Sequence, residues 1–471
     1  MPWISPAAAH AVHHRVRGSS RRLSAKVVAV AQADCRIAKT KKTVSKSRSR
    51  LEKTRSAIAQ VLSGRKTQVV SKGSKDLLLS RATVAKALSQ GKLKSARLKS
   101  KQKRVLVLDA IKVVRVRSTR IARRPPRFNP KKVTKSWVKS LMALYTNGSS
   151  FLTEAEYTAM AKAAVTIQTA EGALAKLTLP ESSAITIIGD THGQYDDVVT
   201  ILEAVGLPST KNVVLFNGDI VDRGPKQIQL LSLVLALKLA FPGSVHVVRG
   251  NHETRTMNQF TERGFAEVVQ QRFTETLWNN FCDYFDELPV MALVSNSLVC
   301  VHGGLPQHVA SGFHLSTLEH MGKVRSPDLA ESEAADMYNE LMWNDSSPEN
   351  GFSPNQRGPD VKSFGPDVTL KFLKENDLSL VVRSHDVRHE GFEVEHDSRL
   401  VTVFSAPAYC GMANKAAFLR FAAQDMADGT AVKDDNIFQF EARPLMTAKK
   451  VSVLRRRVRA FDKKHGVQRS S

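Results

Sequence analysis

Three apolar runs between residues 187 and 253 end in the same kind of polar group, and this repetition limits the folds open to the chain. They read IIGDTHGQ, LFNGDIVDRG and VVRGNHET. Asp219 follows Asp190 by 29 residues, and Asn251 follows Asp219 by 32 residues. Each interval has room for a strand, a loop, a helix and the next strand, which predicts a βαβ succession. Because ligands in open α/β sheets bind at the carboxyl ends of strands, we expect these polar groups to form one site.

The residue types at these strand ends favour hard or borderline divalent metals. Carboxylate, imidazole and amide oxygen are their ligands, whereas a closed structural site would use thiolates. A carboxylate shared by two ions would hold them about 3.5–4 Å apart, the arrangement that clamps an in-line displacement at phosphorus. Arg223 offers a planar fork for a phosphate. His252, beside Asn251, is placed to give or take a proton.

The same residues carry a resemblance to a known family. GDTHGQ, GDIVDRG and GNHE are followed in order by VHGGL, LMWND, RG, RSH and FSAPAYC. These blocks resemble the signatures of the phosphoprotein phosphatases, the two-metal serine/threonine phosphatases. The intervening segments FGPDVTLKFLKEN, RSHDVRHEGFEV and GNHETRTMNQ are most similar to the protein phosphatase 5 type. The resemblance extends from about residue 133 to residue 444.

This resemblance implies an activity and a set of roles. The implied enzyme is a phosphoric monoester hydrolase that hydrolyses phosphoserine and phosphothreonine in phosphoprotein substrates, by direct attack of a metal-bridging water or hydroxide. Two divalent metal ions are implied, manganese in vitro and iron or zinc in the cell. The implied metal ligands are Asp190 and His192 for the first ion, Asp219 as the bridge, and Asn251, His302 and His385 for the second. The implied catalytic residues are His252 as general acid, Asp222 as its orienting partner, Arg223 and Arg357 as a phosphate clamp, and Tyr409 beside them.

The predicted elements indicate an α+β fold. Helices and mixed strands come first and strands dominate after residue 385, which fits two packed sheets covered by helices. The resemblance implies the four-layer calcineurin-like metallophosphoesterase fold, a central β-sandwich flanked by helices. Local patterns predict one or two helices over 152–177, one long helix over 265–285, and a hairpin over 291–304 that turns at Ser295 and Asn296.

Three features depart from the family pattern near the expected substrate groove. Ala408 stands where the family usually has asparagine. The loop 411–415 is one residue shorter than in the protein phosphatase 5 type. Arg255 follows GNHET where the related type carries an acid, and we expect this side chain to be solvated.

Charge divides the 471-residue chain into three parts, which we predict as 1–128, 129–447 and 448–471. The first holds 34 Lys and Arg against 4 Asp and Glu, and the last holds 9 against 1. The middle part, the predicted catalytic domain, holds 27 basic and 39 acidic residues. Both basic extensions are predicted to be disordered, although the last could also form a basic amphipathic helix that docks on the acidic core or binds an acidic partner.

Residues 1–128 hold little apolar material and no 34-residue repeat, so a solvated basic tail is the favoured interpretation. Binding of nucleic acid or an acidic partner, and a transit peptide for organelle import, are its two alternatives. The four cysteines form no CxxC pair, which favours a reducing compartment, and we expect the cytoplasm or the nucleus. No run approaches 18 apolar residues, so no membrane span is expected.

Two other function classes remain open from sequence. The basic extensions also fit a two-metal phosphoesterase that acts on nucleotides or nucleic acid, although the later blocks from VHGGL to FSAPAYC argue against it. A catalytically idle binding protein would require a missing ligand, and all six implied ligands are present.

Overall fold

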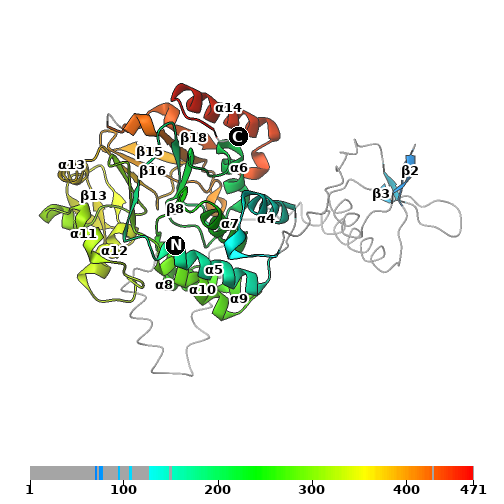
Figure 1. Cartoon of the computed structure of the whole chain (residues 1–471), viewed down its shortest axis with the longest axis horizontal. Helices are drawn as coiled ribbons and strands as arrows, with labels where there is room; N and C mark the ends of the chain where they lie inside the picture. The colour runs from blue at the N-terminus through cyan, green and yellow to red at the C-terminus, as the bar shows by residue number, and fades with distance from the viewer. Residues whose placement is uncertain are drawn as a thin grey trace, which may run out of the picture. The chain divides into compact units, whose positions relative to one another are not determined.

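The computed structural model describes residues 69–71, 74–77, 94–95, 106–108, 127–147, 151–426 and 429–469. The described elements fall into two compact units, with strands β1 to β4 in one and all later elements in the other (Figure 1). The first unit contains a four-stranded sheet in the order β2-β1-β4-β3, made of β1 (Val69–Ser71), β2 (Ser74–Leu77), β3 (Lys94–Ser95) and β4 (Leu106–Leu108). The prediction of a low-order extension over 1–128 is wrong at its end, because Phe128 is buried in the core of the second unit. Apart from the four strands and residues 127–128, this prediction lies outside the described residues.

Two sheets form the centre of the second unit. The five-stranded sheet has the order β18-β17-β6-β7-β8 and consists of β6 (Ala184–Ile188), β7 (Asn212–Phe216), β8 (Val245–Val247), β17 (Ala416–Ala422) and β18 (Ile437–Phe440). The six-stranded sheet has the order β15-β16-β14-β10-β9-β5 and consists of β5 (Leu174–Leu177), β9 (Met291–Val294), β10 (Leu298–Val301), β14 (Leu380–Arg383), β15 (Phe392–Glu395) and β16 (Leu400–Val403). A small sheet in the order β11-β13-β12 adds β11 (Asp345–Ser346), β12 (Phe352–Asn355) and β13 (Gly358–Phe364).

Helices cover the outer faces of both sheets (Figure 1). The α-helices are α4 (Lys135–Asn147), α5 (Glu154–Gln168), α6 (Tyr195–Val205), α7 (Gln227–Ala240), α8 (Arg255–Phe260), α9 (Phe265–Gln270), α10 (Glu275–Asp286), α11 (Leu315–Met321), α12 (Glu333–Trp343), α13 (Pro366–Glu375) and α14 (Ala448–Lys464). Short 3₁₀ turns are η1 (Pro130–Lys132), η2 (Asn251–Glu253), η3 (Gln307–Ser311), η4 (Tyr409–Gly411), η5 (Ala423–Met426), η6 (Asp434–Asn436) and η7 (Arg443–Leu445).

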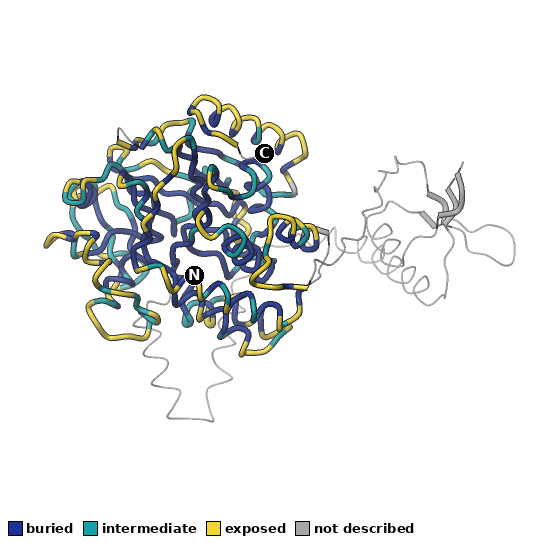
Figure 2. The backbone as a smooth tube through the Cα atoms, in the orientation of Figure 1, coloured by how far each residue is buried: buried dark blue, intermediate teal, exposed yellow. Residues whose placement is uncertain are grey.

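The side-chain alternation of the strands produces four layers. In β6, Ile185 and Ile187 pack against the second sheet, while Ala184 and Ile188 pack against helices. Alternate residues of a strand face opposite sides, so each sheet contributes one face to the inner core and one to a helical layer. Figure 2 shows the buried backbone concentrated in the centre and the exposed backbone around it. The predicted α+β four-layer fold is confirmed.

Several local predictions hold and two need correction. The hairpin β9–β10 turns at Ser295 and Asn296, whose φ values of 47° and 53° suit a tight turn between twisted strands. Residues 174–177, predicted as the end of a helix, form β5 instead, because pairing in parallel with β9 completes the sheet edge. The predicted helix over 265–285 is two helices, since the Thr274 hydroxyl accepts from Leu277 N and begins α10.

The C-terminal extension was predicted to be disordered, and this is wrong for residues 448–469. Helix α14 buries Val451, Leu454, Val458 and Phe461 in the same hydrophobic core as α6 and β18. The apolar residues recur at three- and four-residue intervals and form one stripe, which supplies the burial that orders the segment. Of the alternatives left open from sequence, docking on the core is the one observed. No helix among the described residues has the length and apolar character needed to span a membrane.

Candidate active site

The carboxyl ends of parallel strands from both sheets deliver the predicted polar residues to one place. Asp190, Asp219 and Asn251 follow the parallel strands β6, β7 and β8. His302 and His385 follow β10 and β14, which are parallel in the second sheet. The two sheets are joined here, because the His385 backbone N–H donates to Asp190 Oδ1 over 3.0 Å.

Several residues in these loops have positive φ, although none is glycine. They are His192 (39°), Asp219 (50°), Asp222 (68°), Arg223 (67°), His385 (71°), Ala408 (52°) and Cys410 (49°). Side chains disfavour this region, and such residues persist where surrounding contacts fix them, often at functional sites. The clustering therefore indicates that the loops are shaped to aim particular side chains.

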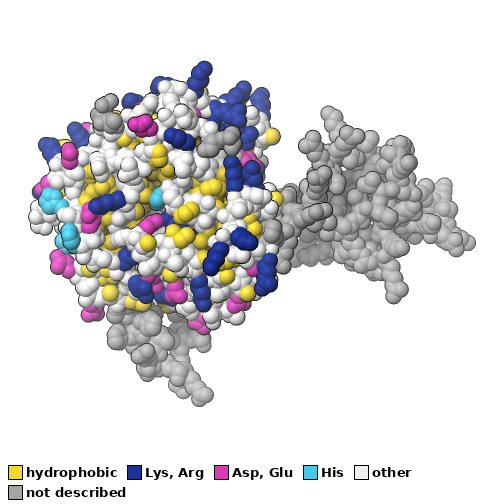
Figure 3. Space-filling model, viewed as in Figure 1, with side chains coloured by type: hydrophobic (Ala, Val, Ile, Leu, Met, Phe, Trp, Pro, Cys, Tyr) yellow, Lys and Arg dark blue, Asp and Glu magenta, His cyan; other side chains and the backbone are white. Residues whose placement is uncertain are grey.

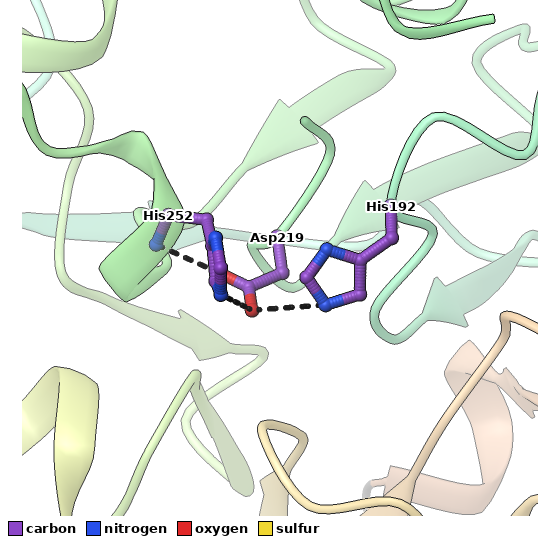
Figure 4. Close-up of side chains that lie close together, drawn as sticks. All are labelled: His192, Asp219 and His252. Carbon is purple, nitrogen blue, oxygen red and sulfur yellow. Dashed lines mark hydrogen bonds and ion pairs between the residues drawn. The ribbon is translucent and has the colours of Figure 1, made fainter. Parts of the chain in front are cut away.

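Asp219 lies at the centre of the site (Figure 4). Its Oδ2 is 3.4 Å from His192 Nε2 and 3.9 Å from His252 Nε2, and its Oδ1 accepts from the His252 backbone N–H. On the other side, Asp219 Oδ1 is 3.3 Å from His302 Nε2. Asp219 is thus shared by two clusters of potential ligand atoms, one with His192 and His252 and one with His302 and His385.

The remaining predicted ligands complete these clusters. Asp190 Oδ2 is 3.7 Å from His192 Nε2, and Asn251 Oδ1 is 3.0 Å from His302 Nε2. His302 Nδ1 faces the backbone oxygen of Asn217, which leaves Nε2 directed toward Asp219. All six predicted ligands are therefore buried together at the junction of the sheets.

The charges at this junction favour a bound cation. Burial, and then repulsion from Asp219, raises the pKa of Asp190 to about 8. Burial would lower the pKa of His302, but the Asp219 carboxylate outweighs it and raises that pKa to about 9. A proton on His302 thus compensates the Asp219 charge when no metal is bound. A divalent cation between the carboxylates would replace that proton and relieve the repulsion.

The donor atoms also fit metal binding. His385 Nε2 is buried without a hydrogen-bond partner among the described residues. Burial lowers the pKa of His385 well below its usual value and that of His192 to about 3, so both imidazoles are neutral, the form that binds metals. Three imidazoles, two carboxylates and one amide oxygen, with no thiolate, suit iron, manganese or zinc better than calcium, which prefers sites built from oxygen ligands alone.

His252 and Asp222 form a separate buried pair. His252 Nδ1 lies 2.5 Å from Asp222 Oδ2, and Asp222 Oδ1 accepts from the Phe265 backbone N–H over 2.6 Å. Burial is the main cause that lowers the pKa of His252 to about 4 and raises that of Asp222 well above its usual value. His252 Nε2 is directed toward Asp219, so the imidazole lies between the two carboxyl groups.

A cavity of about 750 Å³ opens onto this junction, lined by Asp190, His192, Asp219, Asp345, Ser346, Pro354, Asn355, Gln356, Arg357, Ser363, His385, Asp386, Val387, Phe404 and Tyr409. Arg357 lies in the β12–β13 turn, where its Nε donates to Asp345 Oδ2 over 2.6 Å. Tyr409 stacks on the His192 ring with centroids 4.8 Å apart. Burial is the largest cause that lowers the pKa of His252. The positive charges of Arg223 and Arg357 lie near enough to lower that pKa further.

Comparison with known proteins agrees with this geometry. A model of the calcineurin-like phosphoesterase family matches residues 183–389. A solved structure from Saccharomyces cerevisiae, described as a protein serine/threonine phosphatase with similarity to human phosphatase PP5, is 32% identical with a TM-score of 0.57. The match covers 63% of this chain and 92% of that one. The chain belongs to the phosphoprotein phosphatase family.

Curated relatives of this phosphatase-family chain bear the name serine/threonine-protein phosphatase 5. The protein from Solanum lycopersicum is 39% identical over 290 residues, and that from Homo sapiens is 37% identical over 302 residues. These matches cover 61% and 64% of this chain but 49% and 58% of the relatives. The chain thus spans about half of the relatives' length, and its resemblance to the family is confirmed for the catalytic region.

Two buried acids of this family member support the site without having been assigned a role from sequence. The Glu253 carboxylate accepts from the backbone N–H groups of Asp219 and Gly250, over 2.7 and 3.1 Å. It therefore holds the loop that carries the shared carboxylate. Asp345 holds the guanidinium of Arg357 and also accepts from buried Arg383 over 2.8 Å. Their presence inside the GNHE and LMWND blocks was the only signal in the sequence.

The prediction for Arg255 is wrong. Its guanidinium pairs with Asp283 over 2.8 Å and with Asp286 over 2.9 Å, and it is about one-quarter exposed. Two acids on α10 lie directly opposite it, so the side chain bridges α8 to α10 instead of extending into water. Ala408 precedes η4 with φ of 52°, a left-handed conformation in which the family's usual asparagine is more at ease than alanine.

Proposed function

We propose that the chain is a metal-dependent protein serine/threonine phosphatase that hydrolyses phosphoserine and phosphothreonine. One observation carries the proposal: Asp219 is shared by two buried clusters of ligand atoms at the floor of a cavity whose wall carries Arg357. A pair of metal sites facing a guanidinium suits a tetrahedral phosphate, because the cations and the fork together neutralise its oxygens.

The proposed ligands divide between two metal sites. Asp190 and His192 would hold one ion, Asn251, His302 and His385 would hold the other, and Asp219 would touch both. When bound, two divalent cations supply Lewis acidity that lowers the pKa of a water and stabilises charge on the phosphate oxygens. Manganese would serve in vitro, and iron or zinc in the cell.

The chain's own residues complete the mechanism. Asp345 fixes the Arg357 guanidinium at the cavity wall, so that it would bind phosphate oxygens without first losing side-chain freedom. Arg223 would bind the phosphate from the loop after β7. Tyr409 would line the site where it stacks on His192. Because Glu253 fixes the backbone of Asp219, the shared carboxylate stays in place during turnover.

His252 would donate the proton that the leaving serine or threonine oxygen needs. Nε2 faces the shared carboxylate, while Nδ1 contacts Asp222. Asp222, 2.5 Å from Nδ1, would orient the imidazole so that Nε2 carries the proton. Donation from Nε2 of the imidazolium would then leave a neutral imidazole in contact with Asp222.

Turnover of a phosphoserine peptide by the full chain, with and without added Mn²⁺, tests the proposal. We expect metal-dependent release of phosphate from the peptide and much slower cleavage of bis-p-nitrophenyl phosphate, a diester. A chain with Arg357→Ala serves as the matched comparison and should lose peptide turnover while keeping its bound metal. Preference for the diester would favour a nuclease-like phosphoesterase instead.

A further inference from the structure

The outer face of α14 carries a line of basic side chains. Lys449, Arg456, Arg459 and Lys463 are all exposed, at intervals of 7, 3 and 4 residues. At 3.6 residues per turn these positions lie on one side of the helix. They face away from the apolar stripe that the helix buries in the core. We call these four residues the α14 basic stripe.

The stripe has no acidic partner in the described part of the chain, where no ion pair or hydrogen bond involves its four side chains. Basic residues on the flanks of α14 behave differently. Lys450 pairs with Glu441, Lys464 pairs with Asp435, and Arg457 donates to the Ile437 carbonyl. Figure 3 shows Lys and Arg gathered along the edge where Figure 1 places α14. The folded protein therefore presents an uncompensated line of positive charge.

We propose that the α14 basic stripe binds the sugar-phosphate backbone of a nucleic acid. From residue 449 to residue 463 a helix rises about 21 Å, and a duplex presents one phosphate charge per about 1.7 Å of its axis. Each of the four cations can therefore find a phosphate opposite it. The stripe offers no amide or aromatic side chain to read a base, so binding would be independent of sequence.

The composition of this face argues against two other anionic partners, an acidic protein and a membrane surface. Protein interfaces are built on buried aromatic or aliphatic anchors and contain few lysines, and the exposed apolar residues of α14 are only Val453, at 39% exposed, and the small Ala448 and Ala460. Helices that bind membranes insert their apolar face, and α14 has already buried its apolar face in the core. A phosphate backbone requires only the charges.

The test compares three full-length proteins by fluorescence anisotropy with a labelled 20-base-pair DNA duplex in 50 to 200 mM KCl. One is the natural chain. The second carries Lys449→Gln, Arg456→Gln, Arg459→Gln and Lys463→Gln. The control loses the same charge at exposed lysines elsewhere, through Lys131→Gln, Lys139→Gln, Lys162→Gln and Lys374→Gln. Residues 1–128 are common to all three, so their contribution cancels in the comparison. Thermal unfolding midpoints and p-nitrophenyl phosphate turnover should match, which establishes that the variants fold.

The salt dependence gives the decisive measurement. Loss of four phosphate contacts should reduce the slope of log K against log salt by about 3.6, so over this range the natural chain should lose roughly 100-fold more affinity than the stripe variant. The control should keep the slope of the natural chain. Equal slopes for the natural chain and the stripe variant would overturn the proposal. So would selective loss of binding to phosphatidylserine vesicles or to polyglutamate with DNA binding intact, because the stripe would then serve another polyanion.

Discussion

His252 and Asp222 form a buried pair in which Nδ1 of the imidazole lies 2.5 Å from Oδ2 of the carboxyl. His252 also belongs to a cluster of potential metal ligands with His192 and Asp219. The two relationships predict different chemistry, since a ligand would bind metal through Nε2 and a general acid would keep a proton there. We take His252 as the general acid, because Asp222 contacts Nδ1 and can hold the imidazole with a proton on Nε2.

We predict that His252→Asn keeps both metals and the fold but loses about 10²–10⁴-fold in turnover of a phosphoserine peptide. The loss should be smaller for p-nitrophenyl phosphate, because p-nitrophenolate leaves without a proton while serine alkoxide does not. Steady-state kinetics on both substrates, with metal analysis of each protein, makes the comparison. Asp222→Asn should show a weaker form of the same selective defect. Loss of a metal ion from the His252 variant, or equal losses on both substrates when chemistry limits both rates, would exclude the general-acid role.

The shared carboxylate leads to a second prediction. Asp219→Asn removes the negative charge that both metal sites have in common, so bound metal should fall from two ions per chain toward one or none, with nearly complete loss of activity. Asp397→Asn, a change at a carboxylate that is 85% exposed, is the control and should keep both. Elemental analysis after gel filtration gives the stoichiometry. Two ions still bound to the Asp219 variant would show that this side chain does not bridge them.

The site residues that could be predicted were those to which the family resemblance assigns a role. His302 and His385 follow apolar strands within family blocks, and the fold brings them beside Asp219 as expected. Glu253 and Asp345 were left without roles because the resemblance was used only for ligands and catalytic residues, and their partners are Asp219 N–H and Arg383. A sequence pattern shows that such an acid is present, but only the folded backbone shows which N–H groups or guanidinium it faces.

The fold shows the same division. The apolar runs of β6, β7 and α7 were sufficient to predict those elements. Tertiary contacts decided the rest. Residues 174–177 were predicted to continue a helix but pair with β9 as a strand. The high charge of α14 suggested a solvated segment, although an apolar stripe on this helix docks on the core. Net charge indicated a solvated tail, whereas the spacing of Val451, Leu454, Val458 and Phe461 was the better guide.

Asp345 gives a pH-dependent prediction. Burial would raise its pKa, but the charges of Arg383 and Arg357 outweigh burial and hold that pKa well below the usual value. A lowered pKa in the folded state contributes stability above the unfolded pKa of about 3.9, and this stability is lost as the pH falls through the folded pKa. Asp345→Asn should therefore destabilise the protein by about 3–5 kcal/mol at pH 7, because two guanidinium groups lose their partner.

Urea unfolding at several pH values measures this effect. The difference in unfolding free energy between the natural chain and Asp345→Asn should be constant above about pH 5 and should shrink below about pH 4. Asp360→Asn, at an exposed position of β13, should match the natural chain throughout. A difference that grew as the pH fell would contradict the sign of the shift.

The docking of α14 depends on a buried ion pair. Arg420 of β17 is 1% exposed and donates from Nε to Asp462 Oδ1 over 2.7 Å, while its Nη1 donates to Thr186 and Asn212. Asp462→Asn should cost about 3–5 kcal/mol, because a guanidinium would remain buried without a counter-charge. Lys463→Gln, one residue later and exposed, should change stability by less than about 0.5 kcal/mol.

The double change Arg420→Met with Asp462→Leu removes both charges from the interface and should therefore cost less than Asp462→Asn alone. Denaturant unfolding of the four proteins gives these free energies. A double variant less stable than Asp462→Asn would mean that Arg420 contributes more through its hydrogen bonds to Thr186 of β6 and Asn212 of β7 than through its pair with Asp462.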